Sequence, residues 1–248
     1  MKITTWNCNG ALRRKIEIID TLSSDVLIVQ ECEDPCLSTL NYRKWASNYI
    51  WEGENKNKGI GIFAKKGITI ERLDWDSKYT LKTDSSSFNS KLTWRTNDLR
   101  QFIPFIINDQ YICLAVWTKN SPNGVFGYVG QFWKYLQIHR KELSAGNVLI
   151  MGDFNSNKIW DKPDRWWSHS DVISELEEIG ITSLYHQQSN ELQGMETTPT
   201  FYHQRNLSKP YHIDYVFTGN GVKEGTLEIG VANIWLESSD HMPLSLSL

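Results

Sequence analysis

The chain has 248 residues, 40% of them hydrophobic and 22% charged, which is ordinary usage for a globular protein and excludes disordered and fibrous classes. Its longest apolar runs, such as residues 26–29, are too short to cross a membrane. The 26 basic and 29 acidic side chains leave a formal charge of −3, which excludes a generally basic nucleic-acid binder but not an enzyme with a local basic groove.

The four cysteines include no Cys-x-x-Cys pair, so the sequence has no typical zinc or redox motif. The first residues run directly into a strand-like pattern, with no basic and apolar signal segment before it. We therefore expect a cytoplasmic protein with reduced cysteines and no membrane association.

The first thirty residues predict a strand, a helix and a second strand, which together form one βαβ unit. Residues 2–6 are rich in Ile and Thr, which favour strands. Apolar residues then recur at helical spacing over 12–22. Residues 26–30 form a continuous apolar run, which is typical of a strand buried on both faces of a sheet.

Strands and helices continue to the last residue of the chain. Residues 132–143 and 170–179 predict helices, the second with Ser170 as its N-cap and Gly180 just beyond its end. Asn220-Gly221 lies between two apolar runs and predicts a hairpin turn. No linker or repeat divides the sequence, so we expect one α/β domain over residues 1–248 with much antiparallel pairing. The further expected strands are 59–64, 102–108, 111–117, 147–151 and 212–218.

Acidic and amide side chains follow these apolar strands, and polar groups at strand ends meet at one edge of a sheet. Asp214 instead lies within an apolar run, where an unpaired carboxylate is costly. We expect Asp214 to orient the ring of His241 and to stabilise its charged form. The residues at strand ends are Asn7, Asn9, Glu31, Asp153, Asn155, Asp240 and His241.

These residue types suit the hydrolysis of a phosphate ester. Carboxylate and amide oxygens are ligands for Mg²⁺ or Mn²⁺ rather than for zinc. Such a cation binds a phosphate oxygen, a carboxylate orients the attacking water, and a protonated His stabilises the transition state. Each motif alone has a plainer interpretation, because Gly152-Asp153-Phe154-Asn155 also suits a turn after a strand.

Five motifs taken together resemble the endonuclease/exonuclease/phosphatase superfamily, which includes exonuclease III, apurinic endonucleases and deoxyribonuclease I. The resemblance extends from Trp6 to the final strand and implies a four-layer α/β sandwich, in which two mixed sheets pack face to face between helices. The motifs are, in order, Trp6-Asn7-x-Asn9-Gly10, Gln30-Glu31, Gly152-Asp153-Phe154-Asn155-Ser156, Ile213-Asp214-Tyr215 and Ser239-Asp240-His241.

The resemblance also implies a role for each matching residue. Glu31 is implied as the principal metal ligand, with Asn9 and Asp240 lining the metal region. Asp153 is implied to orient or deprotonate the attacking water, and Asn155 to donate a hydrogen bond to the phosphate.

The remaining matches complete the implied site. Asn7 corresponds to a contact behind the metal ligands or on the phosphate side. His241, paired with Asp214, corresponds to the group that stabilises the phosphate in the transition state. Phe201, in a Thr-Phe segment that borders the site in relatives, is implied as a substrate contact.

Some positions depart from the pattern of the nuclease branch. Trp117 stands where that branch commonly has a Tyr, and an indole supplies no hydroxyl. Tyr128 is a candidate to replace that hydroxyl, and is equally well explained as an aromatic residue on the rim. Asn120 fits the polar contact of the family in this loop, whereas His212 replaces a frequent Arg. These departures argue against an apurinic-site specialisation but not against metal-dependent phosphoesterase chemistry.

Two surface features remain open from the sequence. Aromatic and basic residues after Asp153 either stack on unpaired bases or pin a long loop to the domain; they are Trp160, Arg165, Trp166 and Trp167. Four lysines either form a basic rim for phosphates or are ordinary solvated side chains; they are Lys56, Lys58, Lys65 and Lys66.

The preferred interpretation is a phosphodiesterase dependent on Mg²⁺ or Mn²⁺, acting as a nuclease on DNA or RNA and working as a monomer. The alternative within the same chemistry is an enzyme for a small or lipid phosphate ester, although no membrane anchor is visible. A third hypothesis, an inactive nucleic-acid-binding module, is disfavoured because the acidic and His motifs are all present.

Overall fold

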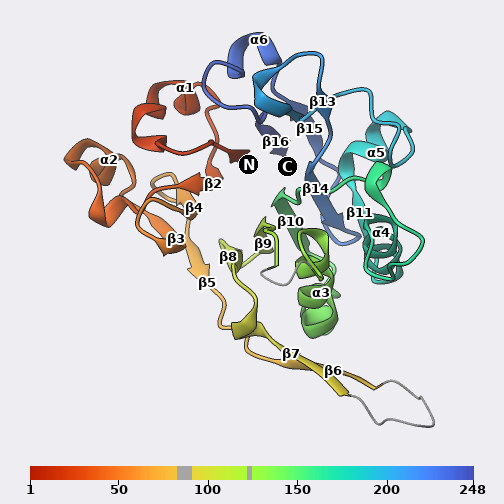
Figure 1. The fold of residues 1–248 in the computed structure, drawn as a ribbon. Helices are drawn as coiled ribbons and strands as arrows, with labels where there is room; N and C mark the ends of the chain where they lie inside the picture. The colour runs from red at the N-terminus through yellow and green to blue at the C-terminus, as the bar shows by residue number, and fades with distance from the viewer. Residues whose placement is uncertain (83–90, 122–124) are drawn as a thin grey trace.

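Two six-stranded mixed sheets pack face to face at the centre of the protein, and helices cover their outer faces (Figure 1). The computed structural model describes residues 1–82, 91–121 and 125–248. The first sheet runs in the order β15 (Thr226–Ile229), β16 (Leu244–Ser247), β1 (Lys2–Asn7), β2 (Val26–Cys32), β4 (Lys58–Ala64) and β3 (Tyr49–Asn55). The second runs in the order β11 (Ile181–Ser183), β14 (Asp214–Gly219), β10 (Val148–Asp153), β9 (Tyr111–Trp117), β8 (Phe102–Ile107) and β5 (Ile70–Arg72).

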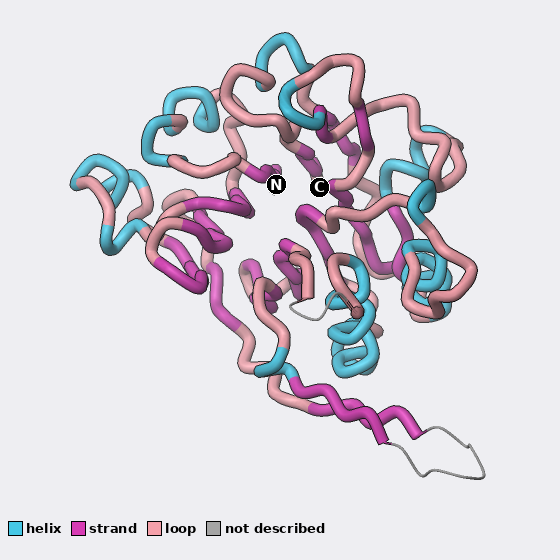
Figure 2. The backbone as a smooth tube through the Cα atoms, in the orientation of Figure 1, coloured by secondary structure: helices cyan, strands magenta, loops and turns pink. Residues whose placement is uncertain are grey.

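The helices lie outside the sheets, and two small ribbons complete the architecture (Figure 2). One ribbon pairs β12 (Phe201–Tyr202) with β13 (Pro210–Tyr211). The other pairs β6 (Lys78–Lys82) with β7 (Lys91–Arg95) and projects from the body of the protein. The helices are α1 (Ile16–Asp20), α2 (Leu40–Trp45), α3 (Val129–Leu143), α4 (His169–Glu178), α5 (Leu184–Ser189) and α6 (Ala232–Trp235). Among the described residues, no helix is long and apolar enough to span a bilayer.

Three apolar layers hold the sheets and helices together, because side chains alternate between the two faces of each strand. Ile3 of β1 and Leu149 of β10 belong to the layer between the sheets. Trp6 packs outward under the helices of the first sheet, and Ile150 packs outward under α3 and α4. The expected four-layer sandwich is confirmed.

The expected βαβ unit is confirmed in its strands but not in its helix. β1 and β2 are parallel neighbours, with Ile3 opposite Val26. The helix predicted over 12–22 is instead a 3₁₀ turn at Leu12–Arg14 followed by the five-residue α1. Lys15, at φ −122°, interrupts the helical backbone between them, since it departs from the helical value near −60°.

The start of α4 also differs from the prediction. Its N-cap is Ser168 rather than Ser170, because the Ser168 hydroxyl accepts from the backbone N–H of Asp171, whose carboxylate accepts from the backbone N–H of Ser168. This reciprocal capping box satisfies two otherwise unpaired donors of the first turn. Gly180 follows the helix at φ +75°, as expected for a C-terminal glycine.

The hairpin predicted at Asn220-Gly221 is wrong. The turn exists, but β14 and β15 on its two sides belong to different sheets. Both edges of β14 are already paired, with β10 and β11, so β15 pairs with β16 in the other sheet. A turn motif fixes a local chain reversal and leaves the pairing partner open.

Candidate active site

Strand alternation brings three polar side chains into the space between the sheets. Asn7 shares the inner face of β1 with Ile3, and Asp153 shares that of β10 with Leu149. Asp214 lies directly opposite Asp153 in the β10–β14 ladder and therefore points to the same face. These residues follow the last apolar residues of that layer, so they form a polar end to an otherwise apolar interior.

Asp153 is the centre of this buried group, with 1% of its surface exposed. Nδ2 of Asn7 donates to its Oδ2 at 2.9 Å, and the backbone N–H of Asn155 donates to its Oδ1 at 2.8 Å. Burial and the neighbouring Asp214 raise the pKa of Asp153 to about 7, against the attraction of His241. A carboxylate with such a pKa exchanges a proton readily near neutrality.

Asp214 and His241 form the ion pair that the sequence predicts. Nδ1 of His241 lies 3.0 and 3.1 Å from the two carboxylate oxygens of Asp214. Burial opposes the charged ring, but Asp214 and Asp153 together raise the pKa of His241 to about 9. The ring is therefore protonated at neutral pH, with Nε2 on the side of Asp153, 4.0 Å from its Oδ2. The ring of Phe201 packs 4.6 Å from that of His241.

The end of β10 and the turn that follows it depend on a glycine within the strand. Gly152 has φ +151°, and a Cβ there would lie 1.9 Å from the carbonyl oxygen of Val116 on the adjacent strand. No other residue fits this close approach. The turn then places Asn155 at φ +46°, from where its Nδ2 donates to Oδ2 of Asp153 at 2.9 Å.

The residues expected around a metal form a second, more exposed group. Nδ2 of Asn9 donates to Oδ1 of Asp240 at 2.9 Å, and the backbone N–H of Asn9 donates to Oδ1 of Asn7 at 3.0 Å. Oε1 of Glu31 lies 3.5 Å from Nδ2 of Asn7, which links this group to Asp153. Oε2 of Glu31 pairs with the Lys58 ammonium at 2.6 Å.

The backbone of this second group adopts an unusual conformation. Asn9 has φ +53° and Glu31 has φ +62°, both in the left-handed region that non-glycine residues rarely adopt. The β2–β4 register also shifts between Gln30 and Cys32, so Glu31 is the extra residue of a bulge. Such local strain is typical of functional positions.

The donor set fits a hard divalent cation. Glu31, Asn9 and Asp240 offer carboxylate and amide oxygens, which are the ligands of Mg²⁺ and Mn²⁺. The carboxylate of Glu31 already forms an ion pair with the ammonium of Lys58. The buried trio Asp153, Asp214 and His241 also has its ligand atoms within 4.8 Å of one another. That trio suits a cation less well, because the protonated His241 ring has no free lone pair for a metal.

The model of the Endonuclease/Exonuclease/phosphatase family matches residues 4–241 of the chain. The chain belongs to this family. Its members hydrolyse phosphate esters with the help of a divalent cation, and this protein is accordingly a metal-dependent phosphodiester hydrolase. No curated protein sequence matches the chain.

Solved structures share the family fold at low sequence identity. The 3′ phosphatase NExo from Neisseria, bound to a product DNA hairpin, is 19% identical with a TM-score of 0.69, over 100% of this chain and 99% of that one. An AP endonuclease from Archaeoglobus fulgidus is 16% identical with a TM-score of 0.64, over 100% and 99%. Truncated TDP2 from Caenorhabditis elegans is 15% identical with a TM-score of 0.60, over 99% and 95%.

The substrate-side residues predicted by the family resemblance lie around this centre at different depths. Trp117 is 5% exposed and stands opposite Asp153 in the β9–β10 ladder, with the Lys119 ammonium 4.0 Å from its ring. Asn120 is exposed and lines a groove of about 310 Å³ with Lys119. Tyr128 is 44% exposed and lines a pocket of about 250 Å³ that Asn155 also lines. None of these three belongs to the buried hydrogen-bonded group.

The sequence leaves open whether the aromatic loop after Asp153 stacks on unpaired bases or is pinned to the domain, and the structure describes the packing of its tryptophans. Trp166 packs at ring-centroid distances of 5.5 Å from Phe126 and 5.0 Å from Trp133, so it pins the loop to α3. Trp160 is 46% exposed and lines the same pocket as Tyr128. Trp166 is itself 45% exposed, and Trp160 packs 5.2 Å from the ring of Tyr211, so both rings combine packing with free surface. They differ in that Trp160 lines the pocket whereas Trp166 does not.

The structure adds residues whose role the sequence reasoning missed. The buried hydroxyl of Thr200 accepts from the backbone N–H groups of Ile213 and Asp214 and so fixes the start of β14. Ser239 donates to the backbone carbonyl of Asn7 at 2.7 Å and ties the end of the chain to β1. Both contacts join residues far apart in sequence, so no local pattern announces them.

The hypothesis that four lysines form a common basic rim is wrong. Lys58 opens β4 beside Glu31, whereas Lys65 and Lys66 follow its last residue, Ala64. β4 is seven residues long, so its ends are roughly 20 Å apart at about 3.3 Å per residue. Of these three, Lys58 lies beside Glu31 of the candidate site.

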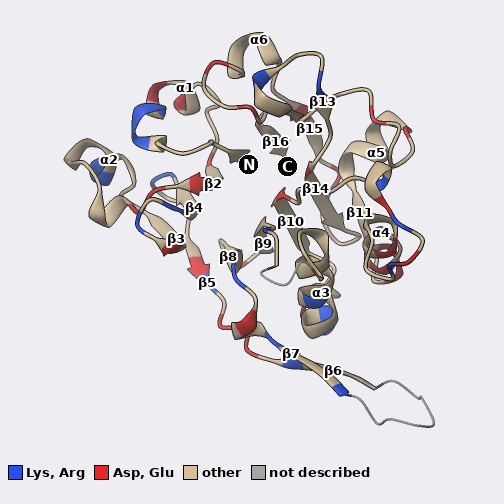
Figure 3. Cartoon of the chain, viewed as in Figure 1, with Lys and Arg blue, Asp and Glu red and all other residues tan. Residues whose placement is uncertain are grey.

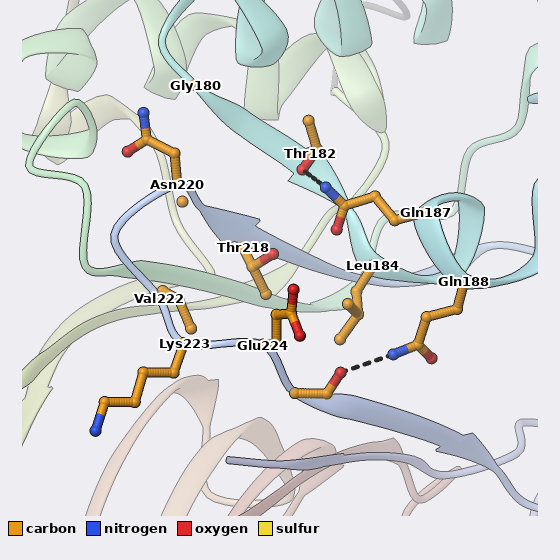
Figure 4. Close-up of a pocket in the computed structure, with 12 residues that line it drawn as sticks. Gly180, Thr182, Leu184, Gln187, Gln188, Thr218, Asn220, Val222, Lys223 and Glu224 are labelled. Atoms are coloured by element: carbon orange, nitrogen blue, oxygen red, sulfur yellow. Dashed lines mark hydrogen bonds between the residues drawn. The ribbon is translucent and has the colours of Figure 1, made fainter.

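A pocket of about 690 Å³ lies at the opposite end of the second sheet (Figure 4). It is lined by Asn220 and Lys223, among others, and the backbone N–H of Gly221 donates to the carbonyl of Gly146, just before β10 begins. Asp153 ends that same strand. The pocket is therefore separated from the family site by the length of β10.

Proposed function

We propose that this protein is a nuclease that uses Mg²⁺ or Mn²⁺ to hydrolyse phosphodiester bonds in DNA or RNA. The observation that carries the proposal is the buried group of Asn7, Asp153, His241 and Asp214. It places a carboxylate with a pKa of about 7 beside a protonated imidazole. Glu31, Asn9 and Asp240 would hold the cation beside it. When bound, the cation neutralises charge on the phosphate and activates water.

Asp153 is proposed to receive the proton of the attacking water. Its Oδ2 accepts hydrogen bonds from Asn7 and Asn155, and its Oδ1 accepts one from the Asn155 backbone. These bonds fix the plane of the carboxylate, so a water can meet it in one defined direction. Because its pKa is about 7, Asp153 is mainly in its ionised, basic form above neutral pH.

His241 is proposed to stabilise the negative charge that develops on the phosphate. Its Nδ1–H donates to Asp214, which fixes the ring and keeps it charged. Its Nε2–H then remains for a phosphate oxygen. A donor that is charged and fixed before the reaction lowers the barrier without the cost of reorganising during it.

The surroundings of the centre favour a polymeric substrate. Two hollows flank it. One is a groove lined by Arg100 and Lys119 together with the acidic Glu54 and Asp98, and the other is a pocket lined by Tyr128 and Trp160 with Arg165. Basic side chains suit phosphates, and exposed aromatic rings suit unpaired bases. The NExo phosphatase, which has a similar fold, is bound to a product DNA hairpin in its structure.

We also propose that the protein works as a monomeric single domain in the cytoplasm. The first strand lies inside the first sheet, with the last strand as its neighbour, which supports one domain over 1–248. Cys8, Cys32 and Cys113 are buried free thiols, which suits a reducing compartment.

Incubation of wild type and Asp153→Asn with end-labelled DNA and RNA, single-stranded and duplex, tests the nuclease proposal. Each substrate is supplied with Mg²⁺, with Mn²⁺ and with EDTA, and exposed Asp109, on the β8–β9 turn, provides the matched control Asp109→Asn. We expect metal-dependent cleavage by wild type and Asp109→Asn but not by Asp153→Asn. Hydrolysis of small or lipid phosphate esters, with every polymer left intact, would favour the alternative and reject the nuclease.

A further inference from the structure

The β6–β7 ribbon differs from the rest of the surface in its charge. Its ten strand residues include four Lys or Arg and no Asp or Glu, in a chain with a formal charge of −3. In Figure 3 blue segments lie along both strands of the ribbon, and red segments lie only beside its root, outside the two strands. A basic projection on an acidic protein calls for a physical explanation.

The register gathers the charges on one face of the ribbon. Lys78 stands directly opposite Arg95, and Thr80 stands opposite Thr93 with their hydroxyl oxygens 3.0 Å apart. Lys91 lies two residues before Thr93 and so shares its face. All five side chains are exposed. One face of the ribbon is therefore basic and hydroxyl-bearing throughout.

This arrangement disfavours the ribbon in isolation. Like charges directly opposite each other, as in Lys78 and Arg95, destabilise an antiparallel pair. Within the described ranges, none of Lys78, Lys91 and Arg95 forms an ion pair. An anionic partner from outside the described protein would relieve the repulsion.

The opposite face anchors the ribbon to the core. Trp94 is 9% exposed, stacks on Tyr79 at 5.9 Å and packs edge-on against Trp133 of α3 at 5.7 Å. The backbone N–H of Thr96 donates to the carbonyl of Ser77 and closes the root of the ribbon. The basic face is therefore held in one orientation by a rigid element.

The root of the ribbon leads into the groove beside the family site. The chain after β7 contributes Asp98, Arg100 and Gln101 to the groove. Its other lining residues include Lys119, which pairs with Glu54 at 3.7 Å, and Asn120. Five residue pairs give the ribbon a length of roughly 17 Å. A polymer that leaves the site along this groove meets the ribbon next.

We propose that the basic face of Lys78, Lys91 and Arg95 binds the phosphate backbone of a nucleic-acid duplex outside the segment that enters the active site. This rests on the proposed nuclease function and names a second contact for the same substrate. Two-stranded ribbons fit duplex grooves in size, and Lys and Arg on their surface neutralise phosphates without reading the base sequence. The contact increases affinity for long substrates and leaves the chemistry unchanged.

The test removes the three charges together, as Lys78→Ser, Lys91→Ser and Arg95→Ser. The matched control is Lys65→Ser, Lys66→Ser and Lys223→Ser, since Lys65 and Lys66 follow β4 and Lys223 lines the pocket at the far end of the sheets. Both sets are placed in the Asp153→Asn background, and binding to a labelled duplex of about 30 base pairs is measured over a salt series. We expect the ribbon variant to bind about tenfold more weakly or worse, with the slope of log affinity against log salt reduced by about 2 to 3.

Activity and stability separate this contact from other effects. With active Asp153 restored, hydrolysis of bis(p-nitrophenyl) phosphate should be unchanged, and the midpoint of thermal unfolding equal or higher, because a like-charge pair has been removed. Equal affinities and slopes for the parent and the ribbon variant would overturn the inference, as would an equal loss in the control. A ribbon-dependent affinity for phosphatidylserine vesicles with none for the duplex would also overturn it. Wild type that neither binds nor cleaves any polymer would instead reject the nuclease proposal.

Discussion

The two halves of the site differ most in burial. Asp153, Asp214 and His241 are 1%, 3% and 5% exposed, between the sheets. Glu31 has 19% of its side chain exposed, and Asn9 is exposed. One half is thus enclosed by the fold, and the other opens to solvent.

This difference separates two kinds of chemistry. A buried charge needs its partners inside the protein, so the enclosed half has fixed hydrogen bonds and strongly shifted pKa values. The open half exchanges partners with solvent, and the ammonium of Lys58 pairs with Glu31 at 2.6 Å. We infer that the enclosed half determines the proton transfers, whereas the open half determines the affinity for the cation.

The largest effect should come from Asp153→Asn, which removes the proposed base from the enclosed half. We expect kcat to fall by about 10²–10⁴-fold with metal affinity nearly unchanged. Folding raises the pKa of Asp153, so the ionised carboxylate destabilises the folded state, and this cost is present in full at pH 8. The neutral Asn removes that cost, so the midpoint of thermal unfolding at pH 8 should stay equal or rise. Activity assays, metal titration and thermal melts check this, and a large loss of metal affinity would contradict the division into halves.

The pH profile should reflect the enclosed half alone. Asp153 is anionic above about 7 and His241 is cationic below about 9, so kcat/KM of wild type should be bell-shaped between these values. Asp214 raises both pKa values, so Asp214→Asn should move both limbs to lower pH and reduce the maximum by about 10²-fold or more. Unmoved limbs in this variant would show that other groups titrate.

Glu31→Gln should affect the open half instead. Replacement of a charged ligand by a neutral one should raise the metal concentration for half-maximal activity by about 10–100-fold. Much of kcat should return at saturating metal, and the pH limbs should stay in place. The exposed Glu71, at the edge strand β5, provides the control Glu71→Gln. A loss of kcat that no metal concentration restores would place Glu31 with the catalytic half.

Lys58→Met should have the smallest effect and the opposite sign. The pair it breaks is half exposed, so the free energy of unfolding should change by no more than about 1 kcal/mol. Removal of a competing cation should lower the metal requirement by a factor of about 2–5 at low ionic strength, with less change in high salt. A raised metal requirement would instead make Lys58 a group that positions Glu31.

The enclosed half was more accessible to sequence reasoning than the open half. The apolar run around Asp214 predicts a buried carboxylate that needs a partner, and its predicted ion pair with His241 is observed. The bulge at Glu31 and its pairing with Lys58 involve β4, a strand that no local motif connects to the site. Local sequence patterns indicate the periodicity of a strand and which of its faces is buried, whereas the partners of that strand in the sheet depend on the topology of the fold.

The sequence by itself determined the secondary-structure periods, the polar residues at strand ends and, through five ordered motifs, the family. Tertiary structure decided which strand pairs with which, as with β15, which joins the first sheet although Asn220-Gly221 looks like a hairpin turn. It also decided the pKa values of Asp153 and His241, because burial and the juxtaposition of the two strands set the local field. Charges separated by up to 88 residues interact there because the fold places them within hydrogen-bonding and ion-pair distances and excludes the water that would screen them.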